Sequence, residues 1–295
     1  MRVIGIGDNV CDLYLHTGMM YPGGQALNFA VNTKALGLCS HYMGVFGTDE
    51  VAAYVKAVLT KRKIPFPMAR TYSGENGYAR VELRQGDRVF LGSNKGGVLR
   101  DHPLELEAAD LTYLRQFLVA HTTNNAYFDE QLPKLAGLGL LISYDYSTRW
   151  NEMDRVTRTA PYVNIAFISC GGQAQEEAVA EGRRLCSSGI DAVCVTLGSQ
   201  GAVLCSGGDV FFQPTARVQA VDTMGAGDAF ASRLLAGLAT AAESDGSGCW
   251  FDPTWRSRTL HAQLPGAAEY AAQACLLSGS FGEGVPIPPE IQQRL

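Results

Sequence analysis

The sequence predicts an α/β fold: a predominantly parallel sheet flanked by helices, with a small β lid. Short apolar runs alternate with helical patterns along the chain, which is typical of β-α-β units. Around residues 77–91 this pattern gives way to strict alternation of apolar and polar residues. The chain has 295 residues, 46% of them hydrophobic, which is enough for one large α/β core.

The alternating elements follow one another in a regular order. Each apolar run is short enough for a buried strand, and each helical pattern is long enough to cross back over a sheet. We expect strands at 3–6, 41–46, 138–143 and 192–197, and helices at 26–36 and 51–59.

Residues 77–91 predict a β-hairpin. Ala79, Val81 and Leu83 alternate with charged residues up to Gln85-Gly86-Asp87, and apolar residues return at Val89 and Leu91. Such a hairpin either projects from the core as a lid or adds an antiparallel edge to the main sheet. A closing lid would exclude water from a reaction beneath it.

The segment 241–265 is polar and predicts an irregular surface insertion. Its three aromatic residues, Trp250, Phe251 and Trp255, either pack on the core or offer rings for a base to stack on. A closing helix is expected at 267–277.

Composition excludes several classes of protein. The net charge of −5 and the absence of a basic run give no support for nucleic-acid binding. The eight cysteines are scattered, with no Cys-x-x-Cys pair for zinc or redox chemistry. There is no apolar stretch of signal-peptide or membrane-spanning length. We therefore expect a cytoplasmic protein with reduced cysteines, no membrane and small-molecule chemistry.

The most informative segment runs from Asp222 to Asp228 and joins a glycine-rich turn to a helix. Gly225 and Gly227 let successive amides converge on a phosphate, and the helix N-terminus adds partial positive charge. Asp228, in the first turn, is placed to take a proton from a hydroxyl. An ordinary acidic helix start is the alternative, but such a start has no need of two glycines.

This segment reads Asp-Thr-x-Gly-Ala-Gly-Asp, the signature of the ribokinase-like, or PfkB-type, carbohydrate kinases, and the chain resembles that family. Residues 7–12 and 22–28 match the family's two sugar-binding elements in order and spacing, and residues 195–201 match an element that lies beside the nucleotide. The resemblance covers most of the chain and implies the family's fold.

The resemblance also implies a set of functional residues. The catalytic group would be Asp228 with the amides of Gly225, Ala226 and Gly227. On the sugar side it implies Asp12, Gly23, Gly24 and Asn28, to which we add Asp8 and His121. Asp8 equally suits a structural cap, and His121, on an expected strand-end loop, equally suits the core or the surface. The nucleotide would contact Thr196, Gly198, Gly201, Gly225 and Gly227.

The implied cofactors are ATP and Mg²⁺, with K⁺ as a further candidate held by Asp222, Met224 and Gly282. The implied partners are a sugar and a second copy of the chain, paired through the lid. We divide the chain into a core of residues 1–12, 22–70 and 98–295, and a lid of residues 13–21 and 71–97.

Within the family, residues 7–9, 87–90, 144–150 and 222–224 are most similar to fructoselysine 6-kinases. That similarity implies phosphorylation of the 6-hydroxyl of a fructosamine, a sugar joined to an amino acid. Kinases for 2-keto-3-deoxygluconate, a nucleoside or a fructose phosphate are alternatives, the last because Arg84, Arg88 and Lys95 could meet a phosphate. A non-catalytic sugar or nucleotide sensor is another.

Several residues depart from the family's pattern. The Asn-x-x-Glu motif that helps to organise magnesium is missing, and Ser169-Cys170-Gly171-Gly172 stands in its place. Glu176 or Glu177 could substitute through water. Arg233 replaces a small residue and could contact substrate or a subunit. Lys95 stands where fructoselysine 6-kinases are expected to have an acidic residue, and Gln25 stands where some members of the family have lysine.

Overall fold

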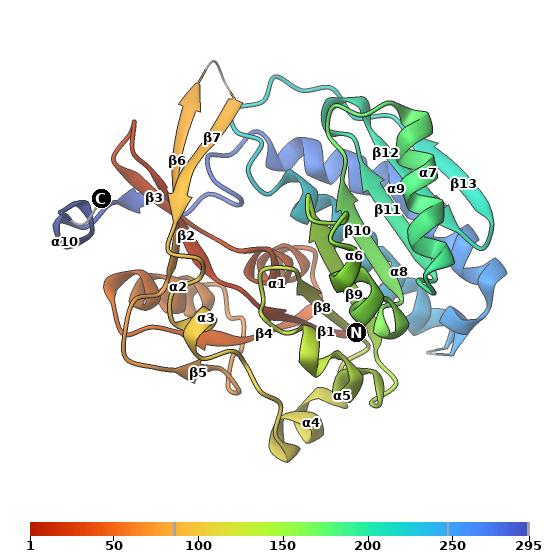
Figure 1. Cartoon of the computed structure of the whole chain (residues 1–295), viewed down its shortest axis with the longest axis horizontal. Helices are drawn as coiled ribbons and strands as arrows, with labels where there is room; N and C mark the ends of the chain where they lie inside the picture. The colour runs from red at the N-terminus through yellow and green to blue at the C-terminus, as the bar shows by residue number, and fades with distance from the viewer. Residues whose placement is uncertain (85–86, 247, 294–295) are drawn as a thin grey trace.

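Two β-sheets organise the chain (Figure 1). This computed structural model describes residues 1–84, 87–246 and 248–293, with the side chains of 83–88 outside the description. The larger sheet has nine strands in the order β13-β12-β11-β10-β9-β8-β1-β4-β5. Its strands are β1 (Arg2–Gly7), β4 (Cys39–Phe46), β5 (Arg70–Thr71), β8 (Val119–Thr123), β9 (Leu141–Ser147), β10 (Ile165–Ser169), β11 (Ala192–Thr196), β12 (Ala202–Ser206) and β13 (Asp209–Gln213).

All neighbouring pairs from β11 to β5 are parallel, whereas the pairs β11–β12 and β12–β13 are antiparallel. Parallel strands end at one edge, so the loops after β1, β8, β9, β10 and β11 lie together. In open parallel sheets this carboxyl edge is where ligands bind.

The smaller sheet is the predicted lid and is separate from the main sheet. Its order is β14-β3-β2-β6-β7. The strands are β2 (Val10–Tyr14), β3 (Met19–Gly23), β6 (Gly77–Arg84), β7 (Asp87–Ser93) and β14 (Val285–Pro286). Strands β6 and β7 form the predicted antiparallel hairpin, although residues 85–86 of its turn lie outside the description.

The lid sheet is larger than the sequence indicated. Its strands β2 and β3 cross the boundaries expected at residues 12/13 and 21/22, and β14 comes from near the end of the chain. Asp12, which the sequence assigned to the core segment 1–12, therefore lies inside β2 of the lid sheet. The division into core and lid segments stays a prediction, and its boundaries would have to move so that all of β2, β3 and β14 belong to the lid.

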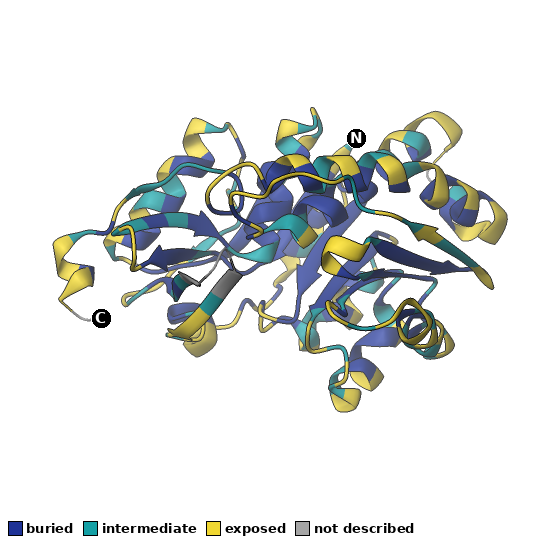
Figure 2. Ribbon diagram, turned by 90° about the horizontal axis from the view of Figure 1, so that it is seen from above, coloured by how far each residue is buried: buried dark blue, intermediate teal, exposed yellow. Residues whose placement is uncertain are grey.

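Helices cover both faces of the main sheet (Figures 1 and 2), and Figure 2 shows its central strands buried between them. The α-helices are α1 (Gln25–Ala35), α2 (Glu50–Lys61), α3 (Val98–Asp101), α4 (Ala108–Leu114), α5 (Leu132–Ala136), α6 (Met153–Thr159), α7 (Gln175–Ser187), α8 (Ala226–Asp245), α9 (Pro253–Ala274) and α10 (Pro289–Gln292). Short 3₁₀ turns are η1 (Asp129–Gln131), η2 (Ala160–Tyr162), η3 (Gly198–Gln200) and η4 (Cys249–Phe251).

Most of the predicted elements are confirmed. The apolar runs at 3–6, 41–46 and 192–197 fall in β1, β4 and β11, and the helices at 26–36 and 51–59 fall in α1 and α2. Helix α2 starts where expected because the side chain of Asp49 caps it, accepting a hydrogen bond from the Ala52 amide at 3.0 Å. The strand expected at 138–143 lies later, at Leu141–Ser147.

The prediction of an irregular insertion at 241–265 was wrong. Helix α8 continues to Asp245, and α9 starts at Pro253, with Pro265 inside it; Ser247, in the polar run, lies outside the description. Trp250 and Trp255 are 4% and 7% exposed and pack with α8 and α9 in one apolar cluster. Burial of these two rings stabilises two helices that the polar sequence did not predict, so Trp250 and Trp255 are core residues. Phe251 is 72% exposed and is not a core residue.

His121 belongs to the core. It lies within β8, where the sequence predicted a strand-end loop, and only 1% of it is exposed. Its ring stacks on Phe29 with centroids 4.7 Å apart, and its Nδ1 is 3.0 Å from the Ser143 hydroxyl. Burial lowers its pKa to about 3, so the ring is neutral at ordinary pH. His121 is therefore not brought to the carboxyl edge.

This burial predicts a pH effect on stability. The unfolded chain gains a proton on His121 below its ordinary pKa of 6.5 whereas the folded chain does not until about 3, so stability falls as pH drops from 6.5 toward 3. Relative to His121→Gln, the wild type should lose roughly 2 kcal/mol of unfolding free energy between pH 7.5 and pH 5. Urea unfolding of both proteins measures the difference, and parallel pH profiles would contradict it.

Two further expectations concern the cysteines and the membrane. All eight cysteines are free, and five of them, Cys11, Cys170, Cys194, Cys205 and Cys275, are buried. Over the described residues, no helix combines the length and apolar character that a membrane span requires.

Candidate active site

The turn before α8 is held in a shape that only glycine adopts without strain. Gly225 has φ 72°, and a Cβ there would lie 2.6 Å from the Cβ of Ser280. A Cβ on Gly227, in contrast, would have no neighbour within 4 Å among the described residues. The first helical turn of α8 therefore faces open space, where its amides and the helix dipole favour an anion such as a phosphate.

Asp222 anchors this turn. It is 2% exposed; one carboxylate oxygen accepts the Met224 amide at 2.9 Å, and the other accepts the Gly279 amide at 2.9 Å and the Tyr14 hydroxyl at 2.5 Å. Tyr14 belongs to β2 of the lid sheet. The lid sheet is thus tied directly to the turn that carries Gly225.

We predict that Tyr14→Phe lowers kcat about tenfold and the unfolding free energy by about 1–3 kcal/mol, because it removes a hydrogen bond to a buried carboxylate. Steady-state kinetics and urea unfolding measure the two effects. Tyr21→Phe is a matched control: its ring packs edge-on against Tyr14 at 4.9 Å, and no hydrogen bond of its hydroxyl is seen among the described residues. Equal losses in both variants would contradict the role of the Tyr14 hydroxyl.

Asp228 and Asn28 meet at the carboxyl edge. The Nδ2 of Asn28, on α1, donates a hydrogen bond to the Oδ2 of Asp228, on α8, at 2.6 Å. Asn28 is 2% exposed, and its Oδ1 has no partner among the described residues. The hydrogen bond orients the Asp228 carboxylate. Because buried polar groups normally have a hydrogen-bond partner, the Oδ1 of Asn28 is a candidate acceptor for a donor group of a ligand.

Gly23 and Gly24 allow close packing where β3 leads into α1. A Cβ on Gly23 would lie 2.8 Å from the Oδ2 of Asp12, which is 5% exposed, and 3.6 Å from the Ser280 hydroxyl. Gly24 has φ 106°, and a Cβ there would meet the backbone of Asp8 and Asn9 at 2.9 Å. Ser280 therefore lies between the Asp12–Gly23 pair and Gly225.

Asp8 caps a helix. Its carboxylate accepts the amides of Gln25 at 2.9 Å and Ala26 at 3.1 Å, at the start of α1, and the Thr123 hydroxyl at 3.1 Å. Burial raises its pKa. Both oxygens are engaged by the chain, so the structural alternative for Asp8 fits better than contact with a sugar.

The residues expected to contact a nucleotide lie farther along the same edge. Thr196 ends β11, and its hydroxyl donates to the Ile168 carbonyl at 3.2 Å. Gly198, with φ 60°, starts η3 and faces open space. Gly201 differs, because a Cβ there would lie 2.2 Å from the Gln213 carbonyl oxygen, so this glycine serves the packing of β13.

The departures from the family pattern also have places in the fold. Arg233 donates to the Gln263 side chain of α9 at 3.1 Å, so it joins two helices of the same chain. Glu177 accepts the Ala174 amide at 3.1 Å as part of a helix cap. Lys95 is exposed, and the side chains of Arg84 and Arg88 lie outside the description. Across the described residues no three Asp, Glu, His or Cys side chains gather as a metal site.

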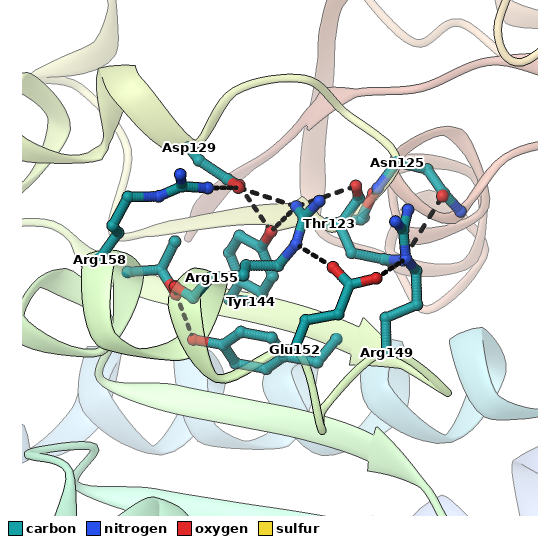
Figure 3. A network of polar contacts seen from close by, with 11 residues as sticks. Thr123, Asn125, Asp129, Tyr144, Arg149, Glu152, Arg155 and Arg158 are labelled. Carbon is teal, nitrogen blue, oxygen red and sulfur yellow. Dashed lines mark hydrogen bonds and ion pairs between the residues drawn. The ribbon is translucent and has the colours of Figure 1, made fainter.

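Arg155 organises the loop after β8 (Figure 3). Its guanidinium donates to Asp129 at 2.8 Å, to the Tyr144 hydroxyl at 3.0 Å and to the Asn124 carbonyl at 3.2 Å. Asn125, next in this loop, donates to the Gln25 side chain at 3.1 Å. The network thus fixes the position of Gln25, the first residue of α1.

Asp145, Ser280 and Tyr14 are site residues that the sequence did not single out. Asp145 lies near the end of β9 and is 6% exposed; burial and, next, the charge of Asp228 raise its pKa to about 8. Asp145 stands in the run 144–150 and Ser280 in the loop that follows the closing helix, so both were in segments already of interest. No local pattern distinguishes them, because their roles depend on partners far away in the sequence.

Comparison with known proteins identifies the family. The model of the pfkB family carbohydrate kinases matches residues 2–275. The chain belongs to this family. It is therefore a carbohydrate kinase, an enzyme that phosphorylates a sugar with ATP as donor, and the resemblance seen in the sequence is confirmed.

Two relatives with known names are similar to this chain over most of its length. Fructosamine kinase FrlD of Bacillus subtilis (strain 168) is 37% identical over 287 residues, covering 97% of this chain and 95% of the relative. Fructoselysine 6-kinase of Escherichia coli (strain K12) is 30% identical over 232 residues, covering 79% of this chain and 87% of the relative.

Solved structures confirm the fold class. Aminoimidazole riboside kinase from Salmonella enterica has a TM-score of 0.69 at 20% identity, with coverage of 100% of this chain and 99% of that one. Ribokinase from Giardia lamblia has a TM-score of 0.77 at 15% identity, covering 95% and 94%. At these identities the likeness establishes the ribokinase-like fold alone.

Proposed function

We propose that this kinase transfers the γ-phosphoryl group of ATP to the primary 6-hydroxyl of a fructosamine, such as fructoselysine. The observation that carries the proposal is the Asn28–Asp228 hydrogen bond of 2.6 Å at the start of α8, beside the open space over Gly227. The sugar-amine substrate is supported by the two relatives whose names describe kinases of fructosamine and fructoselysine.

In this proposal Asp228 accepts the proton of the 6-hydroxyl as the oxygen attacks the phosphoryl group. Asn28 holds the carboxylate in the direction of the hydroxyl. The amides of Gly225, Ala226 and Gly227, with the dipole of α8, stabilise the charge that develops on the transferring group. ATP supplies the phosphoryl group, and in this proposal Thr196 and Gly198 contact it.

Magnesium would be held mainly through phosphates and water. This ion keeps several waters and one or two carboxylates at most in kinase sites, and the described residues offer no cage for it. A monovalent cation fits the side chain of Asp222 poorly, because three donors of the chain already engage its oxygens. The carbonyls of Met224 and Gly282 are the other candidate ligands.

We also propose that the lid pairs with a second copy of the chain. Phe90 and Leu91 on β7 are 60% and 41% exposed, and Leu15, after β2, is 38% exposed. Apolar residues this exposed on a strand near a sheet edge favour pairing with another chain. Sedimentation of the wild type and of Phe90→Glu tests this homodimer: a monomeric wild type would exclude it.

The experiment that tests the reaction is ADP release with Mg²⁺ and ATP across fructosamines, ketoses, 2-keto-3-deoxygluconate, fructose phosphates and nucleosides. Activity on fructosamines above all other compounds is the expected result. Preference for another class would overturn the proposed substrate. Ligand binding without ADP release from any compound would favour the sensor.

A further inference from the structure

Asp145 is a buried carboxylate that the proposed reaction does not use. Its Oδ1 accepts the Ser147 amide at 2.6 Å, and the side chain of Gln25 also stabilises its charged form. The charged groups acting most strongly on it, Asp228 and Asp8, are both carboxylates. Among the ion pairs of the described residues none involves Asp145. The ionised form of Asp145 therefore has no cation within the described chain to balance its charge.

Neutral amides occupy the positions where a balancing cation would be expected. Gln25 stands where some family members have lysine, and Asn125, itself fixed next to the Arg155 network, holds the Gln25 side chain at 3.1 Å. These contacts keep Gln25 in place as a neutral partner of Asp145. A positive charge that stabilises the ionised form of this buried carboxyl group would then come from a ligand.

A second observation points to a ligand with several donors. Asn28, 2% exposed, bonds Asp228 through Nδ2 while its Oδ1 has no partner among the described residues. Asn124, 5% exposed, also has a buried Oδ1 without a partner there, and its amide donates to the Asp145 carbonyl at 2.9 Å. Asn124 is bonded to the Asp145 backbone, and Asn28 is bonded to Asp228, whose charge acts on Asp145; both thus present buried acceptors that a ligand bearing N–H and O–H groups would satisfy.

We propose that Asp145 determines substrate specificity by binding the protonated secondary amine that joins the sugar to the amino acid in a fructosamine. The inference rests on the proposed function. A secondary ammonium brings one positive charge and two N–H donors, which suits a buried carboxylate such as Asp145. A plain ketose or its ether offers neither, so a site built around the amine discriminates against it.

The proposal predicts that binding of the amine releases a proton from Asp145, which calorimetry can detect. Burial and the carboxylates of Asp228 and Asp8 raise the pKa of Asp145 to about 8, while the Ser147 amide and Gln25 oppose the rise. A bound ammonium lowers that pKa again, so amine binding at pH 7 expels a proton from Asp145. The binding enthalpy then depends on the ionisation enthalpy of the buffer.

The test is calorimetry without ATP on the full chain, using fructosylglycine and 1-O-(carboxymethyl)fructose, its counterpart in which an ether oxygen replaces the amine and the carboxylate is kept. Asp145→Asn keeps an acceptor for the Ser147 amide and removes the charge. We expect it to weaken fructosylglycine about 10- to 100-fold, to change ether binding less than threefold, and to abolish the buffer dependence. Asp154→Asn, an exposed carboxylate of α6, is the matched control and should change none of these.

Equal weakening of the amine and the ether would overturn the role of Asp145. The role would also be overturned if Asp145→Asn needed a higher Mg²⁺ concentration for activity, by the same factor with both compounds, because Asp145 would then act by binding the metal ion. If the variant fails to fold, the wild type alone decides: it should bind the amine at least about tenfold tighter than the ether, and equal affinities overturn the inference. A wild type that phosphorylates other sugars but no fructosamine would overturn the proposed substrate and this inference together.

Discussion

Asp228→Asn is expected to lower kcat by about two to four orders of magnitude, because it removes the group that accepts the hydroxyl proton. The fold should survive. The amide oxygen of an asparagine can accept the bond that Asn28 Nδ2 gives Asp228 at 2.6 Å, and the first turn of α8 tolerates a neutral residue. The KM for the sugar should change much less than kcat, since the hydroxyl can still be bound.

The matched control for Asp228 lies on the same helix. Glu243→Gln also changes a carboxylate of α8 to an amide, but Glu243 is 59% exposed and its partner is the amino terminus of the chain. Steady-state ADP release on the best substrate, with thermal unfolding of each variant, separates chemistry from stability. Full turnover by Asp228→Asn would show that another group takes the proton.

The catalytic turn could be predicted from the sequence because its chemistry is local. Between Asp222 and Asp228 the glycines, the helix start and the carboxylate are adjacent in the chain, and the structure keeps them so. The alternating hairpin at 77–91 was predictable for the same reason: a period of two needs no information from elsewhere in the chain. It does not reveal, however, that β14 from residues 285–286 joins the same sheet.

Residues whose roles depend on distant partners could not be predicted. Tyr14 is 208 positions from the Asp222 carboxylate that it bonds, and nothing in residues 10–14 indicates this. His121 looked like a ligand contact because it follows an apolar run, but the strand continues past it to Thr123 and Phe29 covers its ring. For Asp145, burial and the nearby charge of Asp228, which is 83 positions away in the sequence (228 − 145), arise only in the folded chain.

Gly225→Ala is expected to impair both stability and catalysis. Gly225 has φ 72°, which costs a residue with a Cβ about 1–2 kcal/mol. The new Cβ would also lie 2.6 Å from the Cβ of Ser280, and Ser280 is only 2% exposed, so the loop cannot simply move into solvent. We expect a loss of about 2–4 kcal/mol in unfolding free energy and, because the turn shifts, a fall in kcat/KM of about a hundredfold or more.

Gly227→Ala separates these two effects. A Cβ there meets no atom of the described residues within 4 Å, so stability should be kept or rise by up to about 1 kcal/mol, as for other glycines replaced inside helices. Activity should still fall, since the methyl group enters the space proposed for the phosphoryl group.

Adding Ser280→Gly to Gly225→Ala removes the side chain that the new methyl group meets but leaves the Ser280 backbone 2.9 Å away, so it should restore part of the lost stability. If Gly225→Ala unfolds at the same urea concentration as the wild type, the turn does not need its left-handed glycine, and the phosphate-binding shape derived from it fails.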